Sequence, residues 1–195
     1  MAIYIGIDPG LKGAIAVIND RVITFHDMPV VQVKVGTNLK NQMDAHACAL
    51  LLRRYLPPPT SSTDVLVTIE KVAPMPSFKV QRKGEEPSEQ PMGVTSAFTF
   101  GRDFGILIGL CAGIGVPFQL IHPVTWKKRM MADMGKDKDA SRVKAMQLYP
   151  QMASQLSRKK DHARGDALLL ATYARQMAGV PQEVPVEPYG NLFAR

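Results

Sequence analysis

The segment that decides the fold is residues 1–18, MAIYIGIDPGLKGAIAVI. Isoleucine occupies every second position before Asp8, which is the period of a β-strand with two different faces. The turn chemistry of Pro9-Gly10 ends this strand, and AIAVI predicts a second one. A carboxylate at the carboxyl end of a buried strand lies where α/β sheets bind their ligands. We therefore predict that Asp8 binds a divalent metal ion; the alternative is an aspartate that only caps its own turn.

The composition is typical of one globular domain. The 195 residues are 46% hydrophobic and 21% charged, and a chain of this length can bury a sizeable core. No unbroken apolar run reaches the ~20 residues of a membrane span, and no leader pattern precedes the first strand. Cys48 and Cys111 lie in apolar helical segments, which predicts buried thiols in a reducing compartment. We therefore expect a cytoplasmic protein with no membrane partner.

The positive charge is concentrated in one part of the chain. The net charge is +7, and 11 of the 24 Lys/Arg but 4 of the 17 Asp/Glu lie between Thr125 and Arg164. The rest of the sequence is balanced, so one 40-residue segment carries the whole excess. Such a concentration is typical of a nucleic-acid partner, and the alternative is a solvated lysine-rich surface.

Hydrophobic periodicity predicts the remaining elements of one domain, residues 1–178, followed by a proline-rich tail, residues 179–195. Residues 29–42 are expected to form a loop and residues 150–160 a linker. Predicted strands lie at 21–27, 65–69 and 116–121, and predicted helices at 43–55, 95–114, 122–131, 137–149 and 161–177.

Two features of the middle of the chain suggest interactions. Residues 71–92 form a long irregular insert with four prolines and a cluster of basic, amide and aromatic residues, which suits contact with nucleic-acid strands or a plain surface insertion. In the helix at 95–114, glycine recurs at every fourth position from 101 to 113. Each glycine costs a helix about 0.8–1.0 kcal/mol relative to alanine, so close approach of another backbone should offset it. The candidates are the sheet, favoured for part of the stripe, a second subunit, or DNA.

Acids from distant segments complete the candidate site. The strand at 65–69 also ends on an acid, Glu70, and two carboxylates at neighbouring strand ends would repel each other unless a cation lay between them. In KKDHARGDALLLA, His162 and Asp166 are four residues apart and share one helix face, whereas Asp161 suits the N-cap. Asp166 borders a buried apolar face and therefore needs a partner.

Oxygen ligands of this kind suit Mg²⁺, or Mn²⁺ in its place, better than zinc. Beside a basic surface, they predict phosphodiester hydrolysis with two metal ions, which activate the attacking water and stabilise the leaving oxygen. His162 could hold a metal or move a proton, and Lys138 could balance the charge on the phosphate. The alternatives are a capping or packing role for His162 and a plain DNA contact for Lys138.

Five motifs in this order resemble the RuvC family of Holliday-junction resolvases, over roughly residues 2–177. They are GIDPGLKGAIAV, TIEK, the FGRDFG helix, Pro-x-x-Trp-Lys and KKDHARGDALLLA. The sequence is most similar to the phage and bacterial branch that resembles plant chloroplast resolvases. The resemblance implies an α/β, ribonuclease H-like fold with a five-stranded mixed sheet flanked by helices. It also implies a homodimer that makes paired, Mg²⁺-dependent nicks across four-way DNA, in a bacterial nucleoid or a phage-infected cell, without a small-molecule cofactor.

By this resemblance, Asp8, Glu70 and Asp166 take the family's acid roles and His162 takes the fourth position, which is Asp or His in RuvC proteins. The spacing from His162 to Asp166 is four here, against three in bacterial RuvC, which leaves open whether Asp161 or His162 contacts metal. The insert at 71–92 also differs, so no cleavage preference follows. The residues predicted to contact DNA are Phe78, Lys79, Gln81, Arg82, Lys83, Arg102, Lys127, Lys128, Lys136, Arg142, Lys144, Lys159 and Lys160.

Other functions fit parts of the pattern. A sibling nuclease of the same fold would act on flaps, RNA–DNA hybrids or RNA precursors. An ATP-binding protein of the actin or sugar-kinase type would need about twice this length and a second glycine-rich strand turn after Glu70, which the sequence lacks. A non-catalytic DNA-binding module would use the basic segment and not the acids.

Overall fold

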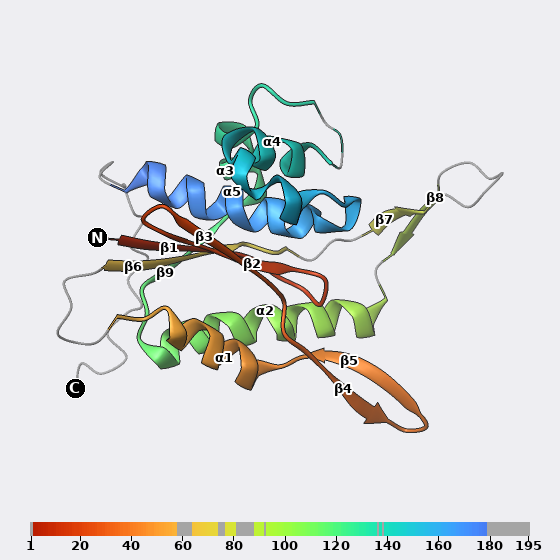
Figure 1. Ribbon diagram of the computed structural model, residues 1–195. Helices are drawn as coiled ribbons and strands as arrows, with labels where there is room; N and C mark the ends of the chain where they lie inside the picture. Colours follow the sequence, from red (N-terminus) through yellow and green to blue (C-terminus); the bar gives the residue numbers. More distant parts are fainter. Residues whose placement is uncertain are drawn as a thin grey trace, which may run out of the picture.

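A five-stranded mixed sheet forms the middle of the molecule, with helices on both faces (Figure 1). The computed structural model describes residues 2–57, 64–73, 77–80, 88–91, 93–135, 137 and 139–178, with backbone alone at 77–80 and 88–91. The strand order is β3-β2-β1-β6-β9; the first three strands are antiparallel, and β6 and β9 run parallel to β1. The ribonuclease H-like fold is therefore confirmed. The strands are β1 (Ala2–Asp8), β2 (Ala14–Asn19), β3 (Val22–Asp27), β6 (Asp64–Glu70) and β9 (Phe118–Ile121).

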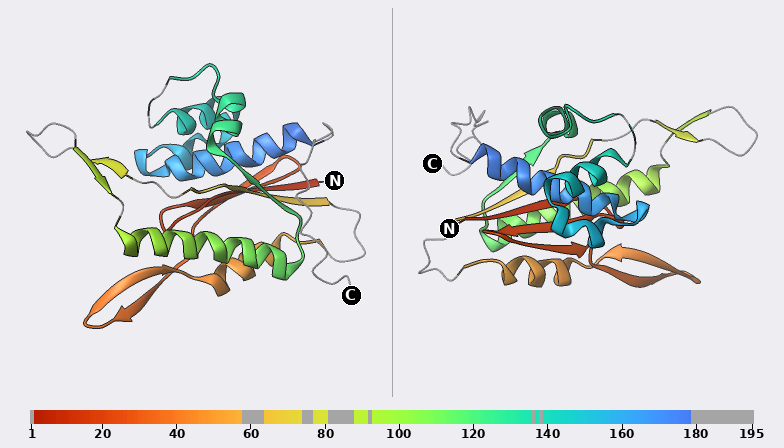
Figure 2. Two further views of the ribbon diagram at one scale, coloured as in Figure 1. Left: turned by 180° about the vertical axis from the view of Figure 1, so that it is seen from behind. Right: turned by 45° about the horizontal axis from the view of Figure 1, so that its top comes forward.

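Two helical layers cover the sheet, and Figure 2 shows them on opposite faces in both views. One layer consists of α5, which packs on β1, β2 and β6, together with α3 and α4, which pack on α5. The other layer consists of α1 and α2, which contact each other. The helices are α1 (Ala45–Arg54), α2 (Val94–Ile114), α3 (Pro123–Met130), α4 (Ala140–Leu148) and α5 (His162–Met177).

The alternation in β1 sends successive residues into different layers. Ile3, Ile5 and Ile7 are buried in the cluster that includes Leu107 of α2. The residues between them face α5, because successive side chains of a strand point to opposite sides of the sheet. Asp8 is an even-numbered residue and therefore lies on the α5 side.

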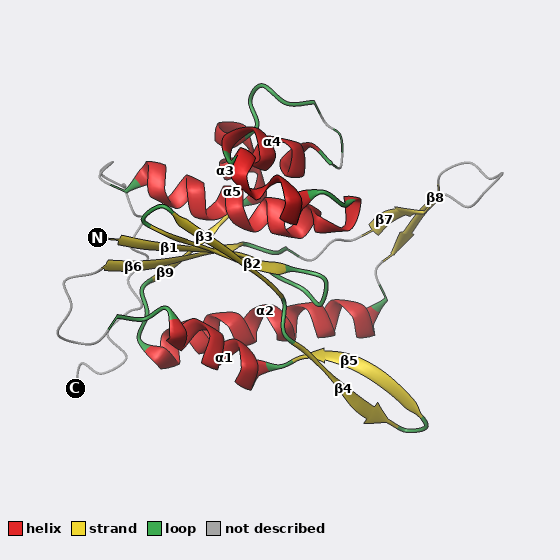
Figure 3. Ribbon diagram, viewed as in Figure 1, coloured by secondary structure: helices red, strands yellow, loops and turns green. Residues whose placement is uncertain are grey.

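Residues 29–42, which we expected to form a loop, are a β-hairpin instead. Strands β4 (Val30–Val35) and β5 (Asn38–Met43) pair antiparallel, and Figure 3 shows the hairpin projecting from the body of the protein. The signal was present in VVQVKV, where valine and polar residues alternate with the period of a strand. The alternation does not lead to burial, since most of the hairpin is exposed.

Two other segments also have more regular structure than predicted. The insert at 71–92 contains a second antiparallel hairpin, formed by β7 (Ser77–Val80) and β8 (Ser88–Pro91). The linker at 150–160 forms two 3₁₀ helices, η1 (Pro150–Leu156) and η2 (Lys159–Asp161). Leu156 is fully buried against the α5 layer, so this segment is part of the core.

The glycine stripe of α2 does not face the sheet. A Cβ atom added at Gly101, Gly105, Gly109 or Gly113 would meet nothing within 4 Å, so the expected helix-to-sheet contact is wrong for the whole stripe. The opposite side of α2, with Leu107 fully buried, packs on the sheet instead. By length and composition alone α2 would also suit a membrane span, although the core helix of a water-soluble protein meets the same test.

The remaining expectations concern the cysteines and the tail. Cys48 and Cys111 are free and buried, as predicted. The boundary at residue 178 stays a prediction, because the tail at 179–195 lies outside the described residues.

Candidate active site

Two acids lie side by side where neighbouring parallel strands end. The paired register of β1 and β6 ends with Ile7 opposite Ile69, and Asp8 and Glu70 are the next residue of each strand. Both face the α5 side, since Ile7 and Ile69 belong to the cluster on the other side of the sheet. The strand alternation therefore brings the two carboxyl groups to one edge of one face, as the sequence predicted.

Gly6 brings the third acid to the same edge. A Cβ atom at this position would overlap the carbonyl oxygen of Ala167 and lie 2.6 Å from the backbone nitrogen of Ala171, so α5 packs directly on β1 here. Asp166 immediately precedes Ala167 and therefore lies beside the end of β1. The close contact of helix and strand holds Asp166 near Asp8, and a larger residue at position 6 would separate them.

Burial raises the cost of ionising all three carboxyl groups, and neighbouring acids add to it at Asp8 and Glu70. Burial raises the pKa of Asp8 well above its usual value, and the charges of Asp166 and Glu70 raise it further. Burial is also the largest effect on the pKa of Glu70 and of Asp166, and it raises both. The Asp166 charge adds to the rise at Glu70. A set of acids that all resist ionisation is characteristic of a site that binds a cation.

Asp166 provides the most direct sign of a missing partner. Its Oδ1 atom is buried and has no hydrogen-bond partner among the described residues. An unpaired buried carboxylate oxygen is expensive, and a hard divalent cation would satisfy it. In the described part of the chain, no three His, Cys, Asp or Glu side chains are grouped closely enough to hold a metal ion. The carboxylate donors and the unpaired Oδ1 of Asp166 still suit a hard divalent ion, which would neutralise the acids if it drew them together.

Positive charge lies next to the acids. Lys127, together with Ser141, His162 and Asp166, lines a cavity of about 630 Å³. The charge of Lys127 lowers the pKa of all three site acids, against the larger effect of burial. We predicted Lys127 as a DNA contact, and the structure places it at the acids themselves. Lys138, predicted as the charge-balancing residue, lies outside the described residues and stays a prediction.

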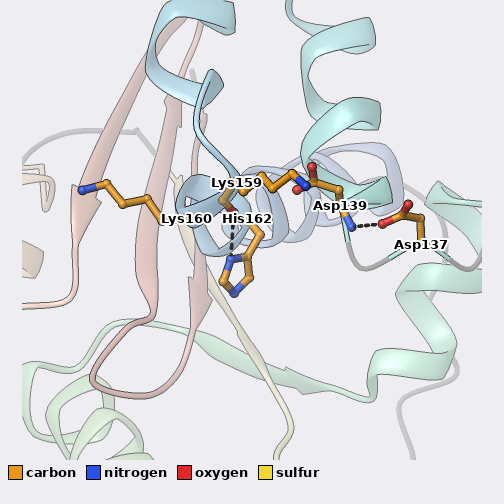
Figure 4. Close-up of a pocket in the computed structure, with 5 residues that line it drawn as sticks. All are labelled: Asp137, Asp139, Lys159, Lys160 and His162. Atoms are coloured by element: carbon orange, nitrogen blue, oxygen red, sulfur yellow. Dashed lines mark hydrogen bonds between the residues drawn. The ribbon is translucent and has the colours of Figure 1, made fainter. Parts of the chain in front are cut away.

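His162 lies at the border of the site, at the first residue of α5. Its Nδ1 atom is 3.3 Å from the carbonyl oxygen of Lys159, and donation along this line would leave Nε2 free. Figure 4 shows the imidazole directed away from the side chains of Lys159 and Lys160, in a pocket of about 440 Å³. Because His162 also lines the cavity that contains Asp166, it can connect the acid site with the basic surface.

The structure bears on the choice between Asp161 and His162. Asp161 is 4% exposed and accepts hydrogen bonds from the backbone nitrogen of Arg158 at 2.9 Å and from its guanidinium at 2.8 Å. This pairing lowers the pKa of Asp161. Asp161 is the N-cap residue of α5, as predicted, but its side chain makes no hydrogen bond to the helix. Its carboxylate is therefore engaged with Arg158, which favours His162 as the fourth group of the site.

Several residues predicted to contact DNA already bind acids of this chain. Arg102 pairs with Asp103 at 2.8 Å, and Lys144 pairs with Asp133 at 2.6 Å. Arg142 is fixed most tightly, since it contacts Asp139 at 2.7 Å and donates to the carbonyl oxygen of Leu156 at 2.8 Å. These groups have structural roles in the protein alone, and their DNA contacts stay predictions.

The remaining residues predicted to contact DNA fall into three groups: fully described, described by backbone alone, and outside the described residues. Lys128 lies in α3, and Lys159 and Lys160 lie in η2; all three are exposed. Phe78 and Lys79 lie in β7, whose side chains are not described. Gln81, Arg82, Lys83 and Lys136 lie outside the described residues.

The sequence analysis missed residues that are not acids themselves but hold the acids in place through packing or hydrogen bonds. In the sequence, Gly6 was only one more residue of the first strand. A glycine two residues before Asp8 was nevertheless a signal that another element packs closely on this strand. Trp126 donates a 2.7 Å hydrogen bond from Nε1 to Oε2 of Glu70, and its motif was noted without a role. Ser141, which hydrogen-bonds to Asp166, gave no sequence signal because the fold sets this partner, whereas Arg158 pairs with Asp161 only three residues away.

The comparisons with known proteins agree with the motifs. No family model matches the chain. A curated relative, the chloroplastic Holliday junction resolvase MOC1 of Chlamydomonas reinhardtii, is 35% identical over 82 residues, which are 42% of this chain and 9% of that protein. The match confirms the resemblance to Holliday-junction resolvases, including those of chloroplasts.

Two solved structures align with most of this chain at low sequence identity. Thermus thermophilus RuvC in complex with a Holliday junction substrate is 16% identical, with a TM-score of 0.48, over 92% of this chain and 96% of that one. A second structure of Thermus thermophilus RuvC is 19% identical, with a TM-score of 0.45, over 91% and 95% of the two chains.

Proposed function

We propose that this chain is a RuvC-like, metal-dependent endodeoxyribonuclease that resolves four-way DNA junctions by paired symmetrical nicks. The observation that carries the proposal is that Asp8, Glu70 and Asp166 lie near one another at the carboxyl ends of β1 and β6, with an unpaired buried oxygen on Asp166. The sequence match to a resolvase supports the choice of branched DNA as the substrate.

The residues of the chain have distinct tasks in this reaction. Asp8, Glu70 and Asp166 would hold Mg²⁺, or Mn²⁺ in its place, with His162 at the border. Bound metal ions supply an activated water and stabilise the leaving oxygen of the phosphodiester. Lys127 offsets the negative charge of the scissile phosphate beside the acids. His162 would accept a proton at Nε2, the nitrogen that does not contact Lys159.

The surroundings of the acids suit a DNA strand. Lys128, Lys159 and Lys160 present exposed charge on α3 and η2 and would bind phosphates. The hairpin β7–β8 begins seven residues after Glu70 and projects from the same end of the sheet. We assign this hairpin to the branch point of the substrate, where the two strands of an arm separate.

A homodimer would match the two-fold symmetry of a four-way junction. The exposed face of α2 offers a surface for it, because the glycine stripe is open and the apolar residues Val94 and Phe98 on the same face are 86% and 72% exposed. A second copy packed there would recover the helix-propensity cost of the four glycines through close backbone contact.

The test offers a mobile four-way junction, a flap, an RNA–DNA hybrid and plain duplex DNA to the full chain with Mg²⁺. We expect paired nicks in the junction alone, lost on addition of EDTA and restored by Mg²⁺. Asp8→Asn should bind the junction as wild type does and lose at least about 10³-fold in cleavage rate. Asp20→Asn is the matched control, because Asp20 lies in the turn at the opposite end of the sheet and asparagine tolerates its positive φ.

Other outcomes would change the proposal in defined ways. Cleavage of flaps or hybrids in preference to junctions would identify a sibling nuclease of the same fold. Cleavage by Asp8→Asn at the wild-type rate would contradict the assignment of the acids.

A further inference from the structure

Trp126 is the only tryptophan of the chain and is completely buried, yet its polar atom faces the acid site. Its Nε1 atom donates to Oε2 of Glu70 at 2.7 Å. An indole has one donor and no acceptor, so this bond satisfies the whole hydrogen-bonding capacity of the side chain. In the described part of the protein, a fully buried aromatic residue is thus attached to a site carboxylate.

The position of this bond follows from the local fold. Ile121 is the register partner of Glu70 at the end of β9, and the backbone nitrogen of Lys71 donates to the Ile121 carbonyl at 2.8 Å. Helix α3 begins two residues later, with Pro123 at its first position. One turn of helix then carries Trp126 over the carboxyl group of Glu70. The strand pairing and the short connection fix donor and acceptor relative to each other.

The bond leaves Glu70 with one oxygen engaged and one available. Oε2 accepts from the indole, and no hydrogen bond to Oε1 is found among the described residues. Lys127 contacts the face of the indole, with its Nζ atom 5.1 Å from the centre of the Trp126 ring. An attraction between the ammonium and the ring keeps the indole and the cation together at the site.

We propose that Trp126 is a positioning residue, which orients Glu70 so that Oε1 is directed to a divalent metal ion. The inference rests on the metal-dependent site of the proposed function. A residue that orients a ligand in this way usually changes metal affinity by 10–100-fold when it is lost. The indole is then also an internal reporter of metal binding, since its hydrogen-bond partner is a ligand.

The test measures Mn²⁺ affinity of the full chain by the electron paramagnetic resonance signal of free Mn²⁺. Trp126→Phe keeps an aromatic ring and removes the donor, and we expect a loss of about tenfold or more in affinity. Tyr149→Phe is the matched control, because it removes a hydroxyl bonded to Thr172 in the same buried cluster without contact to Glu70. We expect wild-type affinity for this control.

A double variant separates positioning from a general loss of structure. In the Glu70→Gln background, Trp126→Phe should cause no further loss of Mn²⁺ affinity, because the carboxylate that Trp126 orients is already lost. Cleavage by Trp126→Phe should return to near the wild-type rate at raised Mn²⁺ concentration. An equal loss in both backgrounds, or a cleavage defect that extra Mn²⁺ does not relieve, would overturn the inference.

A measurement on the unaltered protein covers the case in which Trp126→Phe does not fold. Titration with Mg²⁺ should shift or quench the single tryptophan emission with the same midpoint as metal binding, and Glu70→Gln should abolish the response. Unchanged emission in a wild-type protein that binds metal would contradict the positioning role. Metal binding with the expected emission change but without junction cleavage would instead contradict the proposed function alone.

Discussion

The two helical layers of this protein cover the same sheet and differ in what they contribute. The layer of α3, α4 and α5 brings Asp166, His162 and Lys127 to the ends of β1 and β6. The layer of α1 and α2 contributes apolar residues to the core and leaves an open stripe of four glycines on its outer side. One layer therefore carries the candidate chemistry, and the other stabilises the sheet and offers a surface.

Neighbouring residues of one strand show the difference most directly. Ile7 is fully buried against the α1–α2 layer, whereas Asp8 faces the α5 layer and has a strongly raised pKa. A shift of the β1 register by one residue would place Ile7 on the α5 face and Asp8 on the α1–α2 face. Both faces of the sheet bury an apolar core, and the α5 face also carries the acids whose ionisation is unfavourable.

The largest expected effect compares the same substitution in the two layers. Gly6→Ala should destabilise the fold by about 3 kcal/mol, because the new methyl group overlaps backbone atoms of α5. Gly105→Ala should stabilise the protomer by up to about 1 kcal/mol, since the added methyl meets nothing and alanine favours a helix. Urea unfolding followed by circular dichroism measures both. Equal effects at the two positions would contradict the difference between the layers.

The second prediction tests the outer surface of α2. Gly105→Leu should convert a dimer to a monomer at micromolar concentration without unfolding it, because the leucine prevents close approach of a second helix. Sedimentation velocity measures the change. His46→Leu, which adds the same side chain at an exposed position of α1, is the control and should leave the dimer intact. A wild-type protein that sediments as a monomer would contradict the dimer.

The third prediction concerns stability and pH in the acid cluster. Burial and the charges of Asp166 and Glu70 raise the pKa of Asp8, so the folded state holds its proton more strongly than the unfolded state. The metal-free protein should therefore lose stability as the pH rises from about 4 through the raised pKa. At pH 8, Asp8→Asn should raise the free energy of unfolding of metal-free protein by about 1–2 kcal/mol.

Thermal unfolding in EDTA and in Mg²⁺ measures this effect. Mg²⁺ should stabilise the wild type and have little effect on Asp8→Asn. A variant less stable than the wild type in EDTA would show that Asp8 stabilises the fold and is not held there against repulsion.

The smallest expected effect is at the exposed end of the same layer. Arg164 makes two hydrogen bonds to Asp27, at 2.7 and 2.8 Å, which lower the pKa of Asp27. This pair joins the end of β3 to α5, but the Asp27 side chain is 71% exposed. Asp27→Asn should cost less than about 1 kcal/mol at pH 7, measured by urea unfolding. A much larger loss would show that the ion pair, and not Gly6, fixes α5 on the sheet.

Sequence patterns predicted the sheet strands, the main helices and the acids, because each has a local signal. Alternation identified β1, and an acid at a strand end identified Asp8 and Glu70. Sequence patterns gave wrong predictions for segments whose structure depends on which other element packs against them. The hairpin at 30–43 alternates without burial, and the glycines of α2 face away from the sheet.

The supporting residues could not be predicted, since their partners are distant in the chain. Trp126 and Glu70 are 56 residues apart, and Arg164 and Asp27 are 137 apart. Such pairs exist only when the fold brings them together. Gly6 is intermediate, because its place beside Asp8 was visible but the helix that packs on it was not.

The most direct test of the acid site is a crystal of the full chain soaked in Mn²⁺ and measured at the manganese absorption edge. We predict anomalous density between Asp8, Glu70 and Asp166, within bonding distance of the unpaired Oδ1 of Asp166. A well-ordered site with all three carboxylates and no anomalous density among them would contradict the metal-dependent nuclease.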